Sequence, residues 1–257
     1  MLTVYDETNR TFADVWAYYR GLRWSNLRSP RYRHLFWLLY WPVYGLMFLL
    51  LERVFPLNFH PIACALDDYI PFCEYFVIPY YFWFVLLIGM VAYTLLFNIP
   101  AFRRMMQFIV ITYTVTVVIY LVYPSMQELR PETFPRDNIF TRIVAGLYAF
   151  DTNTNVCPSL HVLGSVAACL GGLECRRFSS LGWRIALVVS ATVVSFSTVF
   201  LKQHSIIDVI VALALSVLAY LMVYARRPRR EAEAPAAEKE EKTAVEAAVR
   251  IKTDERI

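Results

Sequence analysis

Hydrophobic residues form long blocks along this chain, separated by shorter polar stretches. A helix that crosses a bilayer core about 30 Å thick needs roughly 20 apolar residues. The pattern therefore predicts an all-α fold, a polytopic membrane helix bundle with about six transmembrane helices. The blocks that reach or approach the required length are residues 35–54, 76–97, 105–122, 159–175, 183–201 and 206–224.

The fourth block, residues 159–175, differs from the others in its polar content. It contains two serines, a histidine and the pair Gly171–Gly172, and it is barely long enough to span a membrane. Polar residues inside a membrane segment usually face protein rather than lipid. We therefore expect this helix to face the interior of the bundle.

Two further segments have the apolar spacing of a helix outside these blocks. Residues 11–24 have Phe12 and Trp16 on one side and Arg20 near the other, which predicts an amphipathic helix anchored at the membrane interface. Residues 139–150 predict a second interfacial helix that acts as a lid or a brace.

The end of the chain differs in composition from the apolar blocks. It is rich in Ala, Glu, Lys and Arg and has few apolar residues, which is typical of a disordered segment. The predicted organisation is an N-terminal cytoplasmic segment (1–34), a membrane domain (35–225) and a charged cytoplasmic tail (226–257).

Composition supports a membrane protein and argues against other classes. Hydrophobic residues make up 58% of the chain, and the mean hydropathy of +0.44 is well above that of an ordinary soluble domain. The net charge of +4 is mild and the basic residues flank the blocks, so we expect the lipid bilayer, and no nucleic acid, as a partner. The first thirty residues lack the pattern of a cleavable signal peptide, so residues 35–54 are expected to act as an uncleaved signal anchor.

Positive charge is unevenly distributed among the loops. Cytoplasmic loops of membrane proteins are enriched in Lys and Arg. Residues 55–75, 123–158 and 202–205 are poorer in positive charge, so we expect them to face outward from a plasma membrane, with both termini in the cytoplasm. The arginines on which this rests are Arg10, Arg20, Arg23, Arg28, Arg31, Arg33, Arg103, Arg104, Arg176, Arg177, Arg184, Arg226, Arg227, Arg229 and Arg230.

His204 and Asp208 lie four residues apart at the start of the sixth block, so a helix places them on one face. A carboxylate that accepts a hydrogen bond from one imidazole nitrogen leaves the other nitrogen free to attack an electrophile. Because ionisable residues inside membranes are costly and usually functional, we interpret the pair as catalytic. A self-satisfied pair that only pins the end of the helix is the alternative.

The string Pro158–Ser159–Leu160–His161 opens the fourth block. Ser159 is well placed to cap a helix whose free N–H groups and positive dipole end suit an anion such as phosphate. His161, one turn inside, can donate a proton to a leaving oxygen. A lone histidine after a cap is more often only a polar residue near an interface, but here the same outward ends also carry His204 and Asp208.

Two cations accompany these residues. Arg130 lies in an otherwise cation-poor outward loop, and Lys202 precedes His204 by two residues. With Ser159 they form the predicted phosphate-binding set, since guanidinium and ammonium groups bind phosphate oxygens. The alternative for each cation is a solvated loop charge.

At this point the residues resemble the type-2 phosphatidic acid phosphatase (lipid phosphate phosphatase) superfamily, whose motifs read K-x6-R-P, P-S-G-H and S-R-x5-H-x3-D. The resemblance covers roughly residues 35–225 and implies a six-helix membrane enzyme with an outward site. It also implies that His204 is a nucleophile that becomes phosphorylated, that Asp208 orients it and that His161 is the general acid. The matching strings are Tyr123-x6-Arg130–Pro131, Pro158–Ser159–Leu160–His161 and Ser197–Thr198-x5-His204-x3-Asp208.

Three positions depart from the motifs. Tyr123 replaces the first-motif lysine, Leu160 the second-motif glycine and Thr198 the third-motif arginine. Two phosphate-binding cations are thus absent while the His/His/Asp set is intact. This is similar to the inositol phosphorylceramide synthase and sphingomyelin synthase branch, in which a lipid phosphate head group is transferred to another alcohol.

The expected function is cleavage of a membrane lipid phosphate ester through a phosphohistidine, without a metal or other cofactor. Water as acceptor makes the enzyme a phosphatase, and a lipid alcohol as acceptor makes it a phosphotransferase; the sequence does not separate the two. A metal site formed by two histidines and a carboxylate and a non-catalytic lipid-binding protein or transporter are the rival classes. Five cysteines lack metal-binding spacing, and a disulfide between Cys64 and Cys73 is left open.

Overall fold

The computed structural model describes residue 8 and residues 10–53 and 58–225. The chain divides into two units, Met1–Val223 and Tyr224–Ile257, and every element below belongs to the first. The predicted tail, residues 226–257, lies outside the described residues.

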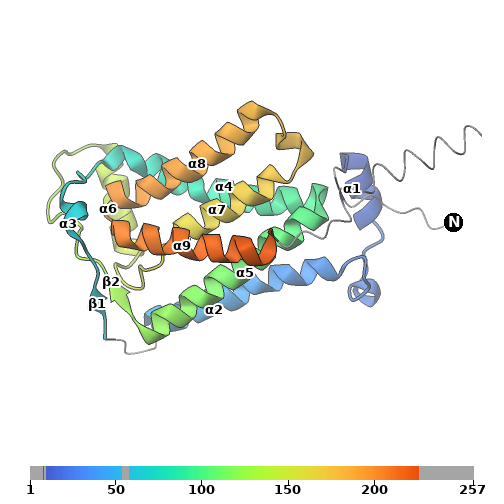
Figure 1. Ribbon diagram of the computed structural model, residues 1–257, viewed down its shortest axis with the longest axis horizontal. Helices are drawn as coiled ribbons and strands as arrows, with labels where there is room; N and C mark the ends of the chain where they lie inside the picture. Colours follow the sequence, from blue (N-terminus) through green and yellow to red (C-terminus); the bar gives the residue numbers. More distant parts are fainter. Residues whose placement is uncertain (1–7, 9, 54–57, 226–257) are drawn as a thin grey trace, which may run out of the picture. The chain divides into compact units, whose positions relative to one another are not determined.

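The described part is mainly helical and has almost no strand, so the predicted all-α class is confirmed (Figure 1). Strands β1 (His60–Pro61) and β2 (Ser125–Met126) form one short parallel pair between two loops. The helices are α1 (Phe12–Tyr19), α2 (Tyr40–Arg53), α3 (Ala65–Asp68), α4 (Val77–Phe97), α5 (Ile99–Val122), α6 (Ile139–Phe150), α7 (Leu160–Leu173), α8 (Leu181–Phe200) and α9 (Ile206–Val223).

Five helical segments of the described chain are long and apolar enough to cross a membrane. The remaining predicted span, residues 159–175, forms α7, which has only 14 residues. The fold is therefore that of a multi-pass membrane bundle with one short internal helix. Two of the long segments include a 3₁₀ helix, Arg33–Leu39 before α2 and Glu74–Phe76 before α4. The five long segments are Arg33–Arg53, Glu74–Phe97, Ile99–Val122, Leu181–Phe200 and Ile206–Val223.

Helix α7 lies inside the bundle and packs against α4, α5, α8 and α9. Its small residues allow these neighbours to come close: a Cβ atom on Gly164 would lie 2.8 Å from the hydroxyl of Tyr113 and 2.9 Å from Nε1 of Trp83. A Cβ atom on Gly171 would lie 2.7 Å from the sulfur of Met105. The expected protein-facing position of this segment is thus explained by close packing of small residues between helices.

Helix α5 begins six residues before the predicted boundary at residue 105. Asn98 caps it, because its side-chain oxygen accepts a hydrogen bond from Ala101 N at 3.1 Å, and Pro100 occupies the first turn, where its missing N–H costs nothing. Arg104, which made this turn look like a loop, forms an ion pair of 2.7 Å with Glu174, directly after α7. The charge therefore ties α5 to the end of α7 instead of ending the helix.

The N-terminal amphipathic helix is shorter than residues 11–24. It is α1, capped by Thr11, whose hydroxyl accepts from Asp14 N at 3.3 Å. Phe12 and Trp16 are 82% and 73% exposed, whereas Tyr18 is buried. The exposed aromatic side chains remain available to a membrane interface.

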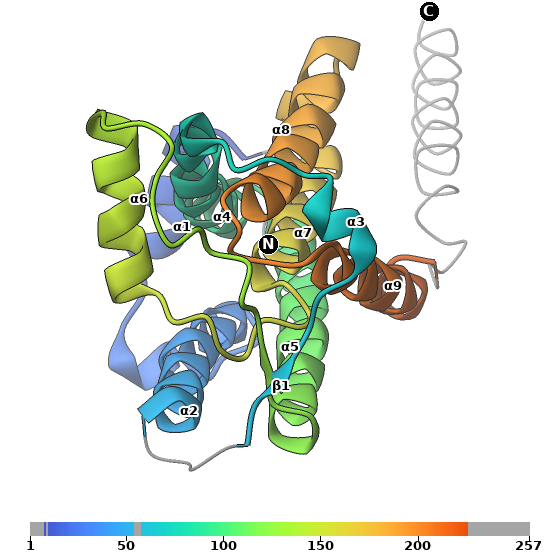
Figure 2. The same cartoon turned by 90° about the vertical axis from the view of Figure 1, so that its left-hand side faces the viewer.

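Helix α6 confirms the helix predicted over residues 139–150. Its buried residues Val144 and Leu147 pack against Val77 and Tyr80 at the start of α4. Figure 2 looks onto the end of the bundle that carries α6 and α3, and Figure 1 shows α1 at the other end. Helix α6 thus braces the first turn of α4, at the end of the bundle where the loops lie.

The close packing of α7 leads to a stability prediction. Gly164→Ala should destabilise the protein by about 1–3 kcal/mol, because the new methyl group overlaps Tyr113 and Trp83. Gly89→Ala is the matched control: this glycine is also inside a helix, but nothing lies within 4 Å of the position that its methyl group would take. Unfolding in detergent micelles measures both variants, and equal stability of the two would contradict the packing of α7.

Candidate active site

His204 and Asp208 form a hydrogen-bonded pair where α9 begins. His204 Nδ1 lies 3.1 Å from Asp208 Oδ2, and the Asp208 carboxylate is completely buried. The same oxygen accepts from Ser205 N at 3.0 Å. A carboxylate can only accept, so Nδ1 carries the proton and donates, and the lone pair of His204 lies on Nε2.

His161 lies on the first turn of α7 and faces the same space. The ring centroids of His161 and His204 are 5.9 Å apart. The His161 ring also packs on Tyr80 and Trp83, with centroid distances of 4.3 and 4.5 Å, and its Nδ1 has no hydrogen-bond partner among the described residues. The three residues predicted to be catalytic therefore come together at one end of the bundle.

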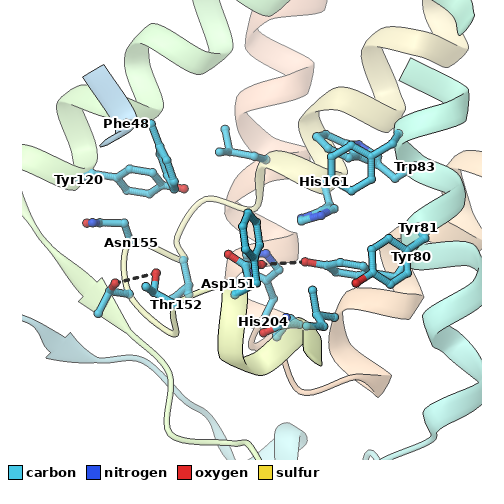
Figure 3. Close-up of a pocket in the computed structure, with 17 residues that line it drawn as sticks. Phe48, Tyr80, Tyr81, Trp83, Tyr120, Asp151, Thr152, Asn155, His161 and His204 are labelled. Carbon is cyan, nitrogen blue, oxygen red and sulfur yellow. Dashed lines mark hydrogen bonds between the residues drawn. The ribbon is translucent and has the colours of Figure 1, made fainter. Parts of the chain in front are cut away.

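The two histidines line a cavity of about 220 Å³ (Figure 3). Its walls are largely aromatic, and its polar groups come from His161, from Tyr80, from the loop after α6 and from residues 203–204. A phosphoryl group with part of a larger substrate fits such a mixed surface. The lining residues are Phe48, Tyr80, Tyr81, Trp83, Phe84, Tyr120, Leu147, Phe150, Asp151, Thr152, Thr154, Asn155, Val156, Leu160, His161, Gln203 and His204.

Ser159 occupies the predicted N-cap position of α7, but its hydroxyl makes no capping hydrogen bond. The side chain is fully buried, lies outside the cavity lining and has no partner among the described residues. Its backbone N–H donates to the carbonyl of Asp208 at 3.2 Å. Ser159 thus links the start of α7 to the first turn of α9.

Arg130, predicted to clamp phosphate, is engaged by protein groups. Its guanidinium donates to the carbonyls of Tyr148, Asp151 and Thr152 at 3.2, 2.9 and 3.0 Å, and to Oε1 of Gln203 at 2.5 Å. Burial lowers its pKa, and the nearby charge of Asp151 acts in the opposite direction. Arg130 does not line the cavity.

Lys202, the second predicted phosphate-binding cation, also bonds to the protein and does not line the cavity. Its backbone has a positive φ of 53°, and its ammonium donates to the carbonyl of Asp67 at 2.7 Å. Burial lowers the pKa of the amine, while Asp67 and Asp68 act to raise it. The structure therefore gathers His161, His204 and Asp208, and it places the predicted phosphate-binding side chains of Lys202, Arg130 and Ser159 outside the cavity lining.

Asp151 and Tyr80 line the cavity, and the sequence did not single out either as a site residue. The Tyr80 hydroxyl donates to Asp151 Oδ2 at 3.0 Å (Figure 3). Burial raises the pKa of Asp151, against the lowering effects of the Tyr80 hydrogen bond and of His204. Asp151 lies in the predicted outward loop 123–158 and Tyr80 in an apolar block, and neither has a local sequence signal of a site residue.

Glu52, at the end of α2, holds the loop that lines the cavity. Its carboxylate accepts from the hydroxyls of Thr152 and Thr154 at 2.6 and 2.8 Å and from the amide of Asn155 at 2.5 Å. Because these three residues lie shortly before α7, Glu52 fixes the path of the chain that leads to Ser159 and His161.

Asp67 on α3 holds the start of α9. Its carboxylate accepts from Ile206 N at 2.8 Å, from the Ser205 hydroxyl at 2.7 Å and from Cys64 N at 2.8 Å. An acidic side chain at the first turn of a helix satisfies unpaired N–H groups there. Figure 2 shows α3 beside the beginning of α9.

Cys64 and Cys73 are free thiols, so the disulfide left open by the sequence is not formed. Within the described residues, no group of three or more His, Cys, Asp or Glu side chains is arranged to hold a metal ion.

Comparison of the chain with protein families, with curated proteins and with solved structures found no match. The function is therefore inferred from the residues and the geometry of the cavity.

The anchoring of α9 by Asp67 leads to a prediction. Asp67→Ala should lower the free energy of unfolding at neutral pH by about 3 kcal/mol, because Ile206 N and the Ser205 hydroxyl lose a charged acceptor. Asp68→Ala is the matched control, since Asp68 is exposed on the same short helix. Denaturant unfolding at neutral pH measures both, and equal loss in the two variants would contradict the anchoring role.

The same anchor should depend on pH. Burial raises the pKa of Asp67, but the hydrogen bonds from Ser205, Ile206 and Cys64 outweigh it and hold the pKa below 3.8. A folded-state pKa below the unfolded value means that the stabilisation is complete above the unfolded pKa and is lost as pH falls through the folded pKa. The stability difference between wild type and Asp67→Ala should therefore shrink below about pH 4, and a constant difference down to about pH 2 would count against the charge as its source.

Proposed function

We propose that this chain is an integral membrane enzyme that cleaves a lipid phosphate ester through a phosphohistidine at His204. The observation that carries the proposal is the His204–Asp208 pair facing His161 across one cavity. The resemblance of the three motifs to lipid phosphate phosphatases supports the same chemistry.

The first step is attack on phosphorus. Nε2 of His204 forms the N–P bond while the P–O bond to the leaving group breaks, and Asp208 stabilises the imidazolium that develops. The leaving oxygen takes its proton from His161. The products of this half-reaction are the released alcohol and a phosphorylated His204.

The second step releases the phosphoryl group. His161, now neutral, removes a proton from the acceptor oxygen, which attacks phosphorus and breaks the N–P bond to His204. Water yields a phosphate monoester or free phosphate, and a lipid alcohol yields a new phosphate ester. Both outcomes share the first half-reaction, so hydrolase and phosphotransferase are alternatives for the same site.

The location of the cavity supports a lipid substrate. It lies at an end of a bundle whose five long helices can span a membrane, and its lining is rich in exposed aromatic rings, including Phe150 and Phe84. Aromatic side chains of this kind suit the boundary between head groups and acyl chains. The arginine-rich segments, including that before α2, favour an orientation in which this end faces outward from a plasma membrane.

A labelling experiment tests the phosphohistidine. Purified protein incubated with a radiolabelled lipid phosphate ester should carry acid-labile, base-stable label on His204. His204→Gln should carry none and should lose activity by at least about a thousandfold, since the nucleophile is gone. Asp208→Asn should lose about a hundredfold or more, because the orienting carboxylate becomes an amide that no longer selects the tautomer.

His60→Gln is the matched control, because this exposed histidine lies in β1, outside the cavity, and should leave label and turnover unchanged. Turnover by His204→Gln at the wild-type rate would contradict the proposal. Adding a lipid alcohol to the labelled wild type separates the alternatives: label that leaves as free phosphate indicates a hydrolase, and label that moves to the alcohol indicates a transferase.

A further inference from the structure

Gln203 is a buried amide in the cavity lining, directly before His204. The residue is only 3% exposed. Nε2 of its amide has no hydrogen-bond partner among the described residues. A buried donor without an acceptor costs free energy, so the position is explained if a ligand supplies the acceptor.

The orientation of the amide is set by Arg130. A guanidinium can only donate, so the group 2.5 Å from Arg130 must be Oε1 of Gln203, and the NH₂ group faces away from it. Arg130 cannot move aside easily, because three backbone carbonyls also hold it. The backbone is pinned as well: the N–H groups of Gln203 and His204 both donate to the carbonyl of Thr198, at 2.9 and 3.1 Å.

The charges around the cavity explain why a neutral donor matters here. Among the described residues, no Lys or Arg belongs to the lining, whereas the carboxylate of Asp151 does. Apart from the two histidines, an anion in the cavity therefore depends on neutral N–H groups.

We propose that Gln203 is a catalytic residue whose Nε2 donates a hydrogen bond to an oxygen of the phosphoryl group attacked by His204. Arg130 is a positioning residue that acts through the amide of Gln203 and does not touch the phosphoryl group. The inference rests on the proposed function and replaces the direct phosphate contact expected of Arg130.

Binding of orthovanadate, measured by calorimetry, tests the donor. Gln203→Glu is nearly isosteric and keeps an acceptor for Arg130, but it removes the donor and adds a negative charge. Gln203→Met removes the donor without adding charge. Both should weaken vanadate binding about 10- to 100-fold, because a hydrogen bond to a charged ligand is lost. Unchanged affinity in both variants would overturn the inference.

A double-mutant cycle tests the positioning role of Arg130. Arg130→Met should weaken vanadate binding about tenfold in the wild-type background and cause no further loss in Gln203→Met, because its effect passes through the amide. Losses that multiply would show direct contact of Arg130 with the anion and would overturn this part. If Arg130→Met does not fold, Arg130→Lys takes its place in the test. Lysine keeps the positive charge but loses the forked guanidinium, so wild-type vanadate affinity in this variant would also overturn the positioning role.

Arg142→Gln is the control, since Arg142 is largely exposed and pairs with exposed Asp137. It should bind vanadate as the wild type does.

Labelling separates this inference from the proposed function. A wild type that forms no phosphohistidine and binds no vanadate overturns the proposed function and this inference with it. A labelled wild type together with full vanadate affinity in both Gln203 variants overturns the inference alone.

Discussion

One backbone hydrogen bond, from Ser159 N to the carbonyl of Asp208 at 3.2 Å, joins the starts of the two helices that carry the histidines. Both residues are completely buried, so each backbone group needs a protein partner in place of water. The bond brings the first turns of α7 and α9 together. His161 and His204 consequently share one cavity, although they lie far apart in the chain.

Charged side chains stabilise this arrangement from the cavity's surroundings. Asp67 holds the start of α9, and Glu52 and Arg130 both hold the loop between α6 and α7. Each charged side chain bonds to several groups of a distant segment, which offsets the cost of removing it from water. The loops at this end of the bundle therefore surround the cavity. The three charged groups form hydrogen bonds to these loops and to the start of α9.

Close packing in the bundle sets the shape of the cavity wall. Gly164 lets the indole of Trp83 and the hydroxyl of Tyr113 approach α7. The same indole packs on the ring of His161, whose position thus depends on a glycine one turn further along α7. A helix of 14 residues suffices here because it lies in the interior of the protein and does not need to match the thickness of a bilayer.

The sequence alone determined the helical class, the apolar blocks and the pairing of His204 with Asp208, because these depend on periodicity and on neighbours within one turn. Only the tertiary structure decided where Arg130 and Lys202 point, since their partners lie far away in the chain. Tyr80, Trp83 and Gln203 carried no local signal, because their roles arise from the groups that packing brings beside them. Hydrogen bonds and burial act on neighbours in space, and a linear pattern records only neighbours along the chain.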